Sequence, residues 1–441
     1  MSTEKRARRP RDLRLDVFRG LAMFIIFIAH TPHNPWNLWI PAAFGPSDAT
    51  ELFVFCSGMA SALAFGSLFR DRSFLLGTAR TAYRVWQVYW AHVALFIVTV
   101  SVIAVFDQWN GGIFYSERLY TRPFFDDTGA HLLAFMTLRY VPNYFDILPM
   151  YMVILVMMPG VMALSRLGRG AVFAAVGAVW LAAQFGLLAF SAEIREGVDR
   201  EWYFNPFGWQ LIFFIGFSFV MGWLKPPPRS YGLTVVALLV LALGVVTSSR
   251  YGWDNFAWVA PFREAVPWLF WKTDLGIFRV VHFLAFAYVA WMLAGEGGRR
   301  LSLDGVAGRV IGVIRKVGQQ SLAVFVSGMV LSQIMGWALD HSAERGPAAL
   351  AAANLSGIVI LIAIAYIVGW FKSEPWRREP VPHPSQAKGA KAAAPAELRA
   401  DMRVAVPRGG EARAGKAAAP TAPGAPGAGG PIAGGAAREP V

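Results

Sequence analysis

The sequence predicts an all-α protein: a polytopic membrane bundle of about ten transmembrane helices with both termini in the cytoplasm. Of its 441 residues, 56% are hydrophobic and only 16% are charged, and the chain contains 17 Trp and 33 Phe. This composition is typical of a membrane protein and disfavours a soluble domain. Apolar segments of helical length recur along the chain, and the connections between them alternate between basic and non-basic. That alternation predicts the orientation of the bundle.

Ten apolar segments are long enough to cross a bilayer as helices. We expect them near 14–31, 49–69, 82–106, 144–165, 169–190, 206–224, 231–249, 276–295, 317–338 and 350–371. The first segment lacks a small-residue cleavage site, so we interpret it as a retained helix and not as a signal peptide.

The charges between these segments fall on every second connection. Basic residues precede the first span and follow the second, fourth, sixth, eighth and tenth, whereas the other connections are neutral, mixed or acidic. The positive-inside rule then places both termini in the cytoplasm and the aromatic-rich connections outside. The net charge of +13 is attributed to these cytoplasmic loops and not to nucleic-acid binding.

The chain divides into three parts by composition. Residues 1–13 form a basic cytoplasmic N-terminus, 14–371 the membrane domain, and 372–441 an Ala/Pro/Gly-rich tail that offers no apolar face and is expected to be a disordered cytoplasmic extension. The single cysteine, Cys56, excludes an intramolecular disulfide and lies in an apolar run, where packing is the expected role.

The first span carries ionisable groups at both ends of one helical face. Asp16 and Arg19 stand at its start and His30 at its end. Eleven steps of 100° place Arg19 and His30 on one stripe, roughly 16 Å apart along the axis. Ionisable groups inside a membrane usually face the protein interior, so both are functional candidates. The alternatives for His30 are a helix-end residue before Pro32, and a metal ligand together with His33.

The second span begins with Asp48 and Glu51. Their spacing fits a capping arrangement at a helix start. Glu51 would also lie at the outer end of the second helix, level with His30, where a bond from its carboxylate to one imidazole nitrogen would hold the tautomer in which the other nitrogen acts as a base. Ser57 and Gly58 lie near the same stripe as Glu51 and permit close helix approach.

Further polar residues interrupt the later spans. Arg80 and Arg84 precede the third span, where they either anchor the topology or join Arg19 in a basic mouth for a polyphosphorylated ligand. Each of the others can serve as structural hydrogen-bonding glue, but together they imply a polar interior. They are Asp146, Tyr151, Asn205, Gln210, Arg279, His282, Gln319 and Gln320.

Six segments resemble, in order, parts of one known family: "LDVFRGLAMFIIFIAH", "DATELFVFCSG", "DILPMYMVIL", "FNPFGWQLIFFIG", "LGIFRVVHFLAFAY" and "GQQSLAVF". The resemblance covers about residues 12 to 371 and is to the OpgC family, the succinyltransferases of osmoregulated periplasmic glucans, a branch of the acyltransferase-3-like membrane acyltransferases. It implies that Arg19 and His30 match an arginine and a histidine considered essential in that superfamily.

We therefore expect an inner-membrane, multi-pass O-acyltransferase that takes a succinyl group from succinyl-CoA and passes it to hydroxyls of a periplasmic glucan. His30 is the expected base, and Arg279 either stabilises the oxyanion or binds the succinyl carboxylate. We expect no tightly bound cofactor, no metal and no nucleic-acid partner. The other expected partners are membrane lipid and a carbohydrate acceptor. A transporter without chemistry and a membrane scaffold are the alternative classes. The candidate residues are His30, Glu51, Asp48 and Arg279 for catalysis; Arg19, Arg80 and Arg84 for the donor; and Asp146, Asn205, Gln210, His282 and Gln320 for the substrate.

Overall fold

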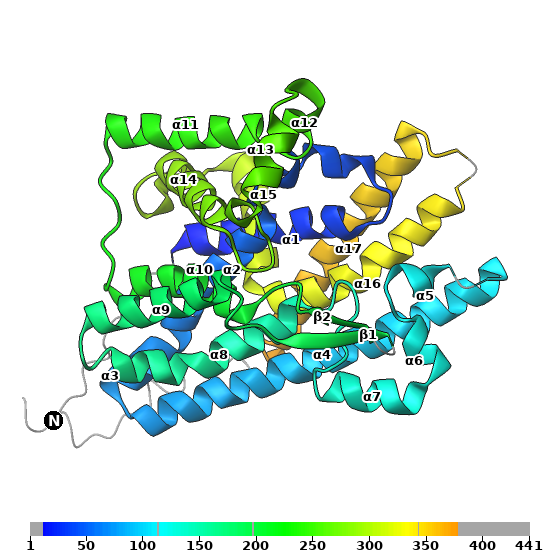
Figure 1. Ribbon diagram of the computed structural model, residues 1–441, viewed down its shortest axis with the longest axis horizontal. Coiled ribbons are helices and arrows are strands. Elements are labelled where there is room, and N and C mark those ends of the chain that lie inside the picture. Colours follow the sequence, from blue (N-terminus) through cyan, green and yellow to red (C-terminus); the bar gives the residue numbers. More distant parts are fainter. Residues whose placement is uncertain (1–11, 113, 196–197, 343, 378–441) are drawn as a thin grey trace, which may run out of the picture. The chain divides into compact units, whose positions relative to one another are not determined.

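The computed structural model describes residues 12–112, 114–195, 198–342 and 344–377. Nearly all of its regular structure is helical, so the predicted all-α class is correct (Figure 1). The exception is a hairpin, β1 (Ser191–Arg195) paired antiparallel with β2 (Val198–Glu201), where the fifth span was expected to end.

The helices follow the order of the predicted spans. Their bounds are α1 Leu13–His30, α2 Ala49–Ser61, α3 Ser67–Asp71, α4 Phe74–Asn110, α8 Ile147–Leu164, α9 Arg169–Gln184, α10 Pro206–Met221, α11 Tyr231–Val246, α14 Ile277–Ala294, α16 Ser321–Asp340 and α17 Pro347–Phe371. The shorter helices in the connections are α5 Tyr115–Arg118, α6 Arg122–Asp126, α7 Thr128–Met136, α12 Tyr251–Asn255, α13 Val259–Ala265 and α15 Gly305–Gln319.

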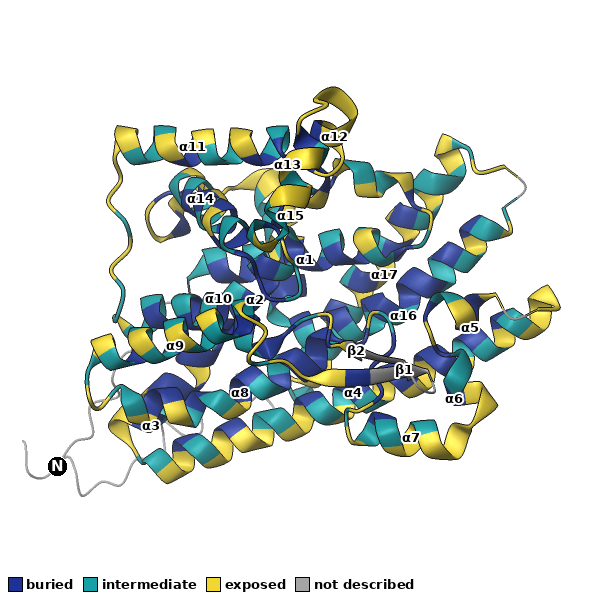
Figure 2. Ribbon diagram, viewed as in Figure 1, coloured by how far each residue is buried: buried dark blue, intermediate teal, exposed yellow. Residues whose placement is uncertain are grey.

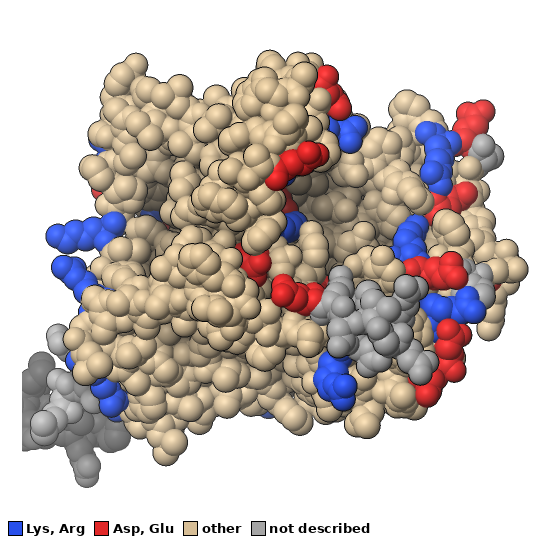
Figure 3. Space-filling view, in the orientation of Figure 1, with Lys and Arg blue, Asp and Glu red and all other residues tan. Residues whose placement is uncertain are grey.

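Among the described residues, six helices are long and apolar enough to cross a membrane. They are α2 continued through α3, α4, α8, α14, α16 and α17, whereas α9, α10 and α11 are apolar but shorter. The count of ten spans and the cytoplasmic placement of the termini therefore stay predictions. Figure 3 shows Lys and Arg side chains along the edge near α3 and α9, and mixed charges at the opposite edge near α5 and α6.

The structure differs from the prediction at the start of α4 and at α15. α4 begins at Phe74 and not near residue 82, because the helix continues through the polar turns that carry Arg80 and Arg84. α15 was not predicted, since its basic residues led us to assign it to a connection. It packs on α1 so closely that a Cβ at Gly318 would lie 1.8 Å from the carbonyl oxygen of Asp16.

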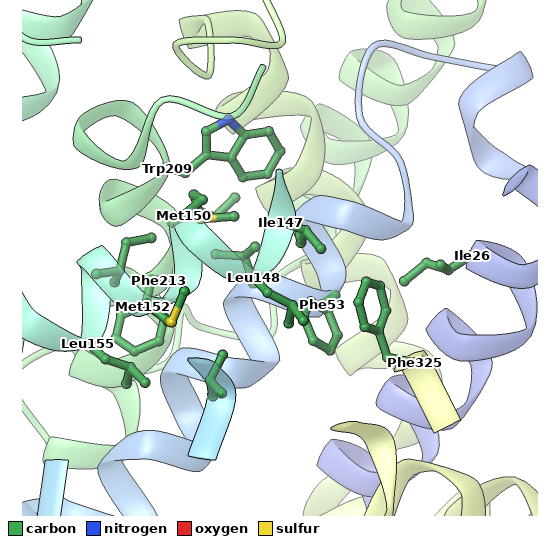
Figure 4. Close-up of a cluster of buried hydrophobic side chains, with 14 of the residues drawn as sticks. Ile26, Phe53, Ile147, Leu148, Met150, Met152, Leu155, Trp209, Phe213 and Phe325 are labelled. Carbon is green, nitrogen blue, oxygen red and sulfur yellow. The ribbon is translucent and has the colours of Figure 1, made fainter. Parts of the chain in front are cut away.

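The core lies among α1, α2, α4, α8, α10 and α16 and is built from aromatic, Met and branched side chains (Figures 2 and 4). Glycines let the helices of this core approach. A Cβ at Gly58 of α2 would lie 2.0 Å from the carbonyl oxygen of Phe213, and one at Gly216 of α10 would lie 2.3 Å from that of Phe55. The close approach expected at Gly58 is therefore confirmed, and α10 is its partner.

Candidate functional site

A cavity of about 920 Å³ opens at the end of α1. We call it the His30 cavity. Residues from α1, α2, α8, α12 and α16 and from the connections before α2, α8, α10, α12 and α14 line it. Aromatic rings and hydrogen-bonding groups are mixed in its wall, with both signs of charge. The polar and aromatic lining residues are His30, Asn37, Asp48, Thr50, Phe53, Asn143, Tyr144, Asp146, Tyr203, Phe204, Ser249, Arg250, Asp254, Lys272 and Phe325.

His30 is the last residue of α1, and its ring is held by the helix itself. Nδ1 lies 2.8 Å from the carbonyl oxygen of Ile26. A carbonyl only accepts, so Nδ1 carries a proton, and in the neutral ring Nε2 is the nitrogen that keeps its lone pair. The ring of Tyr144 packs edge-on against the imidazole, with centroids 4.9 Å apart. The ring is therefore held at the cavity wall in an orientation that leaves Nε2 as the nitrogen that can act as a base.

Four charged side chains form a network beside this cavity. Glu51 accepts from Nε of Arg279 at 2.8 Å, and from Nη2 at 2.5 Å. Asp48 accepts from the Lys272 ammonium at 2.5 Å and lies 3.7 Å from Arg279. Two cations and two carboxylates thus neutralise one another, which is the arrangement that makes buried charge tolerable.

The network corrects one expectation. Glu51 does not bond to His30. One of its carboxylate oxygens accepts from the Arg279 guanidinium, and the other accepts from the backbone N–H of Asp48 at 2.8 Å. The capping box expected from the sequence is present. The tautomer of His30 is set by the Ile26 carbonyl, which the sequence could not show.

The outer pair of the network has shifted acidities. Burial alone would raise the pKa of the Asp48 carboxyl, but the Lys272 ammonium and the Arg279 guanidinium hold that pKa below its ordinary value. Burial would lower the pKa of Lys272, but the Asp48 carboxylate raises it above its ordinary value. Both groups therefore stay charged at neutral pH.

A second cavity, of about 560 Å³, lies near the start of α1. We call it the Arg19 cavity. Arg19, Arg80, Arg84 and Lys372 line it, and no Asp or Glu occurs among the described lining residues. Arg19 donates to the hydroxyl of Ser321, while Lys372 donates to Gln320 at 2.8 Å. The three arginines proposed for donor binding are therefore brought together.

A π-helical turn, Ala62–Gly66, shapes the wall of the Arg19 cavity by joining α2 to α3. Ala64 and Phe65 of this turn line the cavity. Such turns often occur at functional sites, because the wider helix re-aims the side chains that follow. Tyr83 of α4 also lines the cavity, with the Arg80 guanidinium 5.6 Å from its ring centroid.

The structure divides the remaining predicted residues. Asp146 lines the His30 cavity and accepts from the backbone N–H of Tyr203 at 3.1 Å, and Gln320 lines the Arg19 cavity. Asn205, Gln210 and His282 line neither of the two cavities.

Those three residues make structural contacts. Asn205 caps α10 and donates to Asp274 at 2.8 Å, and Gln210 donates to the Val176 carbonyl oxygen at 2.8 Å. His282 pairs with the Ser47 hydroxyl at 2.6 Å. These three residues hold elements together, which is the alternative that their sequence positions left open.

Lys272, Tyr144 and Lys372 are among the cavity residues that sequence reasoning missed. Lys272 is the single lysine of the aromatic-rich connection 250–275, and that is the signal that marks it. Tyr144 stands beside the polar run that ends in Asp146 and carries no distinguishing motif. Lys372 was assigned to the basic end of the last span.

Arg279 was expected to face the substrate but is committed to Glu51 and does not line either cavity. His33, considered as a metal partner of His30, instead lies 3.3 Å from Asp340. Within the described ranges, no group of three His, Cys, Asp or Glu side chains is placed to hold a metal ion.

Comparison with known proteins gives one match. The model of a family described as OpgC protein matches residues 11–373. Neither the curated proteins nor the solved structures contain a significant match.

Proposed function

Because the chain belongs to the OpgC family, we propose that it is a membrane O-acyltransferase that moves an acyl group, succinyl in the first instance, from acyl-CoA to a hydroxyl of a periplasmic glucan. The observation that carries the proposal is the pairing of two cavities along α1, one around His30 with its Nδ1 bonded to the helix backbone and one around four cations.

The Arg19 cavity suits the nucleotide end of acyl-CoA. Three guanidinium groups and an ammonium match the charge of a diphosphate and a ribose phosphate, and guanidinium forks bind phosphate oxygens in pairs. Tyr83 offers an aromatic face for the adenine ring. The absence of carboxylates from the described lining favours an anionic ligand over a cationic one.

The distance between the two cavities fits the donor. Arg19 and His30 are separated by roughly 16 Å along the helix axis. The pantetheine arm runs through about thirteen bonds from its phosphate to its sulfur, and at roughly 1.2 Å of advance per bond it spans about 16 Å. A donor anchored at Arg19 therefore brings its thioester to the level of His30.

The reaction then follows from the state of His30. Nε2 takes the proton of an acceptor hydroxyl, the oxygen attacks the thioester carbonyl carbon, and the carbon–sulfur bond breaks with release of the coenzyme A thiolate. The proton held on His30 is returned to the thiolate or to solvent. Lys272 and Arg250, unlike Arg279, line the cavity, and Lys272 is the cation that we propose to stabilise the oxyanion.

The His30 cavity suits a carbohydrate acceptor. Asn37, Asn143, Asp146 and Asp254 provide amide and carboxylate groups for hydroxyls, while Tyr144 and Tyr203 provide faces for the apolar side of a sugar ring. This mixture supports a glycan more than an apolar ligand.

The test is acyl transfer by the purified full-length protein with radiolabelled succinyl-CoA and a β-glucan oligosaccharide. We expect His30→Gln to lower turnover by about 10² to 10⁴, the usual loss on removing a general base. His131→Gln is the matched control, because Nδ1 of His131 also bonds to the carbonyl four residues before it, at 2.9 Å, but lies outside both cavities.

Arg19→Lys provides a second arm of the test. It keeps the charge but loses the planar fork, so the KM for the donor should rise more than kcat falls. Normal turnover in His30→Gln, or movement of intact donor across vesicles without label on the glycan, would contradict the proposal and favour a transporter.

A further inference from the structure

The two cavities approach each other closely but remain separate. On α2, Phe53 lines the His30 cavity and Ser57 lines the Arg19 cavity. On α8, Ile147 lines the His30 cavity and Tyr151 lines the Arg19 cavity. Each pair is four residues apart, a rise of about 6 Å. The barrier between the cavities is therefore about one helical turn thick.

Two aromatic rings fill this barrier. Phe53 of α2 and Phe325 of α16 stack with centroids 5.8 Å apart and planes 18° from parallel. Ile26 and Ile147 lie alongside them (Figure 4). The neighbours of Phe325 in the chain, Ala323 and Val326, line the Arg19 cavity.

We propose that the acyl-bearing arm of the donor reaches His30 by passing between Phe53 and Phe325. When no donor is bound, the stacked rings seal the two cavities from each other. This inference rests on the proposed function, because the arm must cross the layer that the rings occupy. Phe53 and Phe325 are thus positioning residues, and they touch the arm and not the reacting atoms.

The geometry supports a seal that opens. Phe53, Phe325, Ile26 and Ile147 are apolar, so these side chains offer water and ions no polar partners. The two rings are held by offset stacking and packing, and a change of side-chain rotamer is the motion that would open the layer.

Sided cysteine labelling tests the seal without using catalysis. Cys56 is the only cysteine, so Cys56→Ala gives a background without thiols. Ala29→Cys reports on the His30 cavity and Ala60→Cys on the Arg19 cavity, because both positions line their cavities. A charged, membrane-impermeant thiol reagent is added to right-side-out and to inverted vesicles of the full-length protein.

We expect each reporter to label from one side only, and from opposite sides. Phe53→Ala and Phe325→Ala should each make Ala29→Cys label from both sides, with at least a tenfold gain on the formerly closed side. Phe53→Leu, a milder change, should give an intermediate gain and guards against misfolding. Phe106→Ala is the matched control, because Phe106 is 5% exposed, as against 6% for Phe53 and 4% for Phe325, but lies in a separate cluster.

The outcomes separate this inference from the proposed function. One-sided labelling in well-folded Phe53→Ala and Phe325→Ala would overturn the seal even if acyl transfer were observed. Two-sided labelling in Phe53→Ala and Phe325→Ala, together with no acyl transfer by the wild-type protein, would support the seal and contradict the proposed acyltransferase function. A rise in labelling with Phe106→Ala equal to that with Phe53→Ala would also overturn the proposal, because loosened packing would explain both.

Discussion

The Glu51–Arg279 ion pair is the most deeply buried charge contact at the site. The Glu51 side chain is fully buried, and that of Arg279 is 7% exposed. Removal of one member of such a pair leaves an uncompensated charge, whereas removal of both often costs little. The pair is therefore expected to hold α14 against α2 mainly because loss of one partner would leave a buried, unpaired charge. The net contribution of the intact pair to the free energy of unfolding is expected to be small.

We predict that Glu51→Leu alone lowers the free energy of unfolding by about 3 kcal/mol or more, while Glu51→Leu combined with Arg279→Met costs less than either single change. The measurement is thermal unfolding of the purified variants in detergent, analysed as a double-mutant cycle. A double variant that is less stable than either single variant would contradict a coupled pair.

Asp48 predicts a pH dependence of stability. Its pKa is lowered in the folded protein, so the unfolded state binds protons first and the ion pair with Lys272 contributes fully above about pH 4. The contribution is lost as the pH falls further, through the folded pKa. The difference in melting temperature between the wild type and Asp48→Asn should therefore be constant from pH 8 to 5 and shrink below pH 4. A difference that changes between pH 8 and 6 would show that another group is responsible.

At the residue scale, the sequence predicts the relative position of two site residues only where both lie on the same helix. Arg19 and His30 lie on one helix, so periodicity alone places them on one stripe. The partner of Glu51 is 228 positions away, and no local pattern connects residues so distant. Lys272 and Lys372 were missed for the same reason, because their place in a cavity wall depends on how separate helices pack.

At the scale of elements, the crossing of α2 and α10 positions one wall of the His30 cavity. Gly58 and Gly216 allow each backbone to approach the other, and α2 carries Asp48, Glu51 and Phe53 at the end that meets the His30 cavity. The depth of this crossing follows from two small residues whose partners the sequence could not identify.

We predict that Gly58→Ala separates α2 from α10 and lowers both the melting temperature and acyl transfer, because the new methyl group would lie 2.0 Å from the Phe213 carbonyl oxygen. Gly177→Ala on α9 is the control, since nothing lies within 4 Å of its added methyl group and alanine favours a helix. Equal effects of the two substitutions on melting temperature would contradict the role of the crossing.

A membrane-crossing segment and the helix that contains it need not have the same ends, and this explains why the predicted start of α4 was wrong. Hydropathy locates the part of α4 that suits a bilayer, but the helix extends to Phe74 because arginine is a good helix former. α15 was missed because its charge pattern resembles that of a loop, although Gly20 and Gly318 allow it to pack on α1.

At the scale of the whole molecule, the boundary between the helical part of the chain and the C-terminal extension leads to a prediction about deletion. Helix α17 ends at Phe371, and Trp376 packs on Trp370 with ring centroids 5.9 Å apart. The predicted tail, which begins at residue 372, falls outside the described residues beyond 377. Lys372 lies in the wall of the Arg19 cavity.

We predict that truncation after Arg378 leaves expression, melting temperature and acyl transfer largely unchanged. Truncation after Phe371 removes Lys372 and should raise the KM for the acyl donor several-fold. Lys372→Ala in the full chain is the companion variant, and it should reproduce that rise. Loss of transfer on truncation after Arg378 would show that the extension has a function of its own.

The thin barrier between the two cavities has an electrical consequence. Water-filled cavities carry the potential of each compartment inward, so the membrane voltage would fall mainly across the layer of Phe53 and Phe325 and not across the roughly 30 Å of hydrocarbon. Moving one elementary charge through 100 mV is worth about 2.3 kcal/mol. With the predicted orientation, an interior-negative voltage drives an anionic acyl group outward through the layer and leaves a neutral one unaffected. An energised membrane would thus act as part of the driving force for a dicarboxylic acyl group such as succinyl, and would give no such help to acetyl.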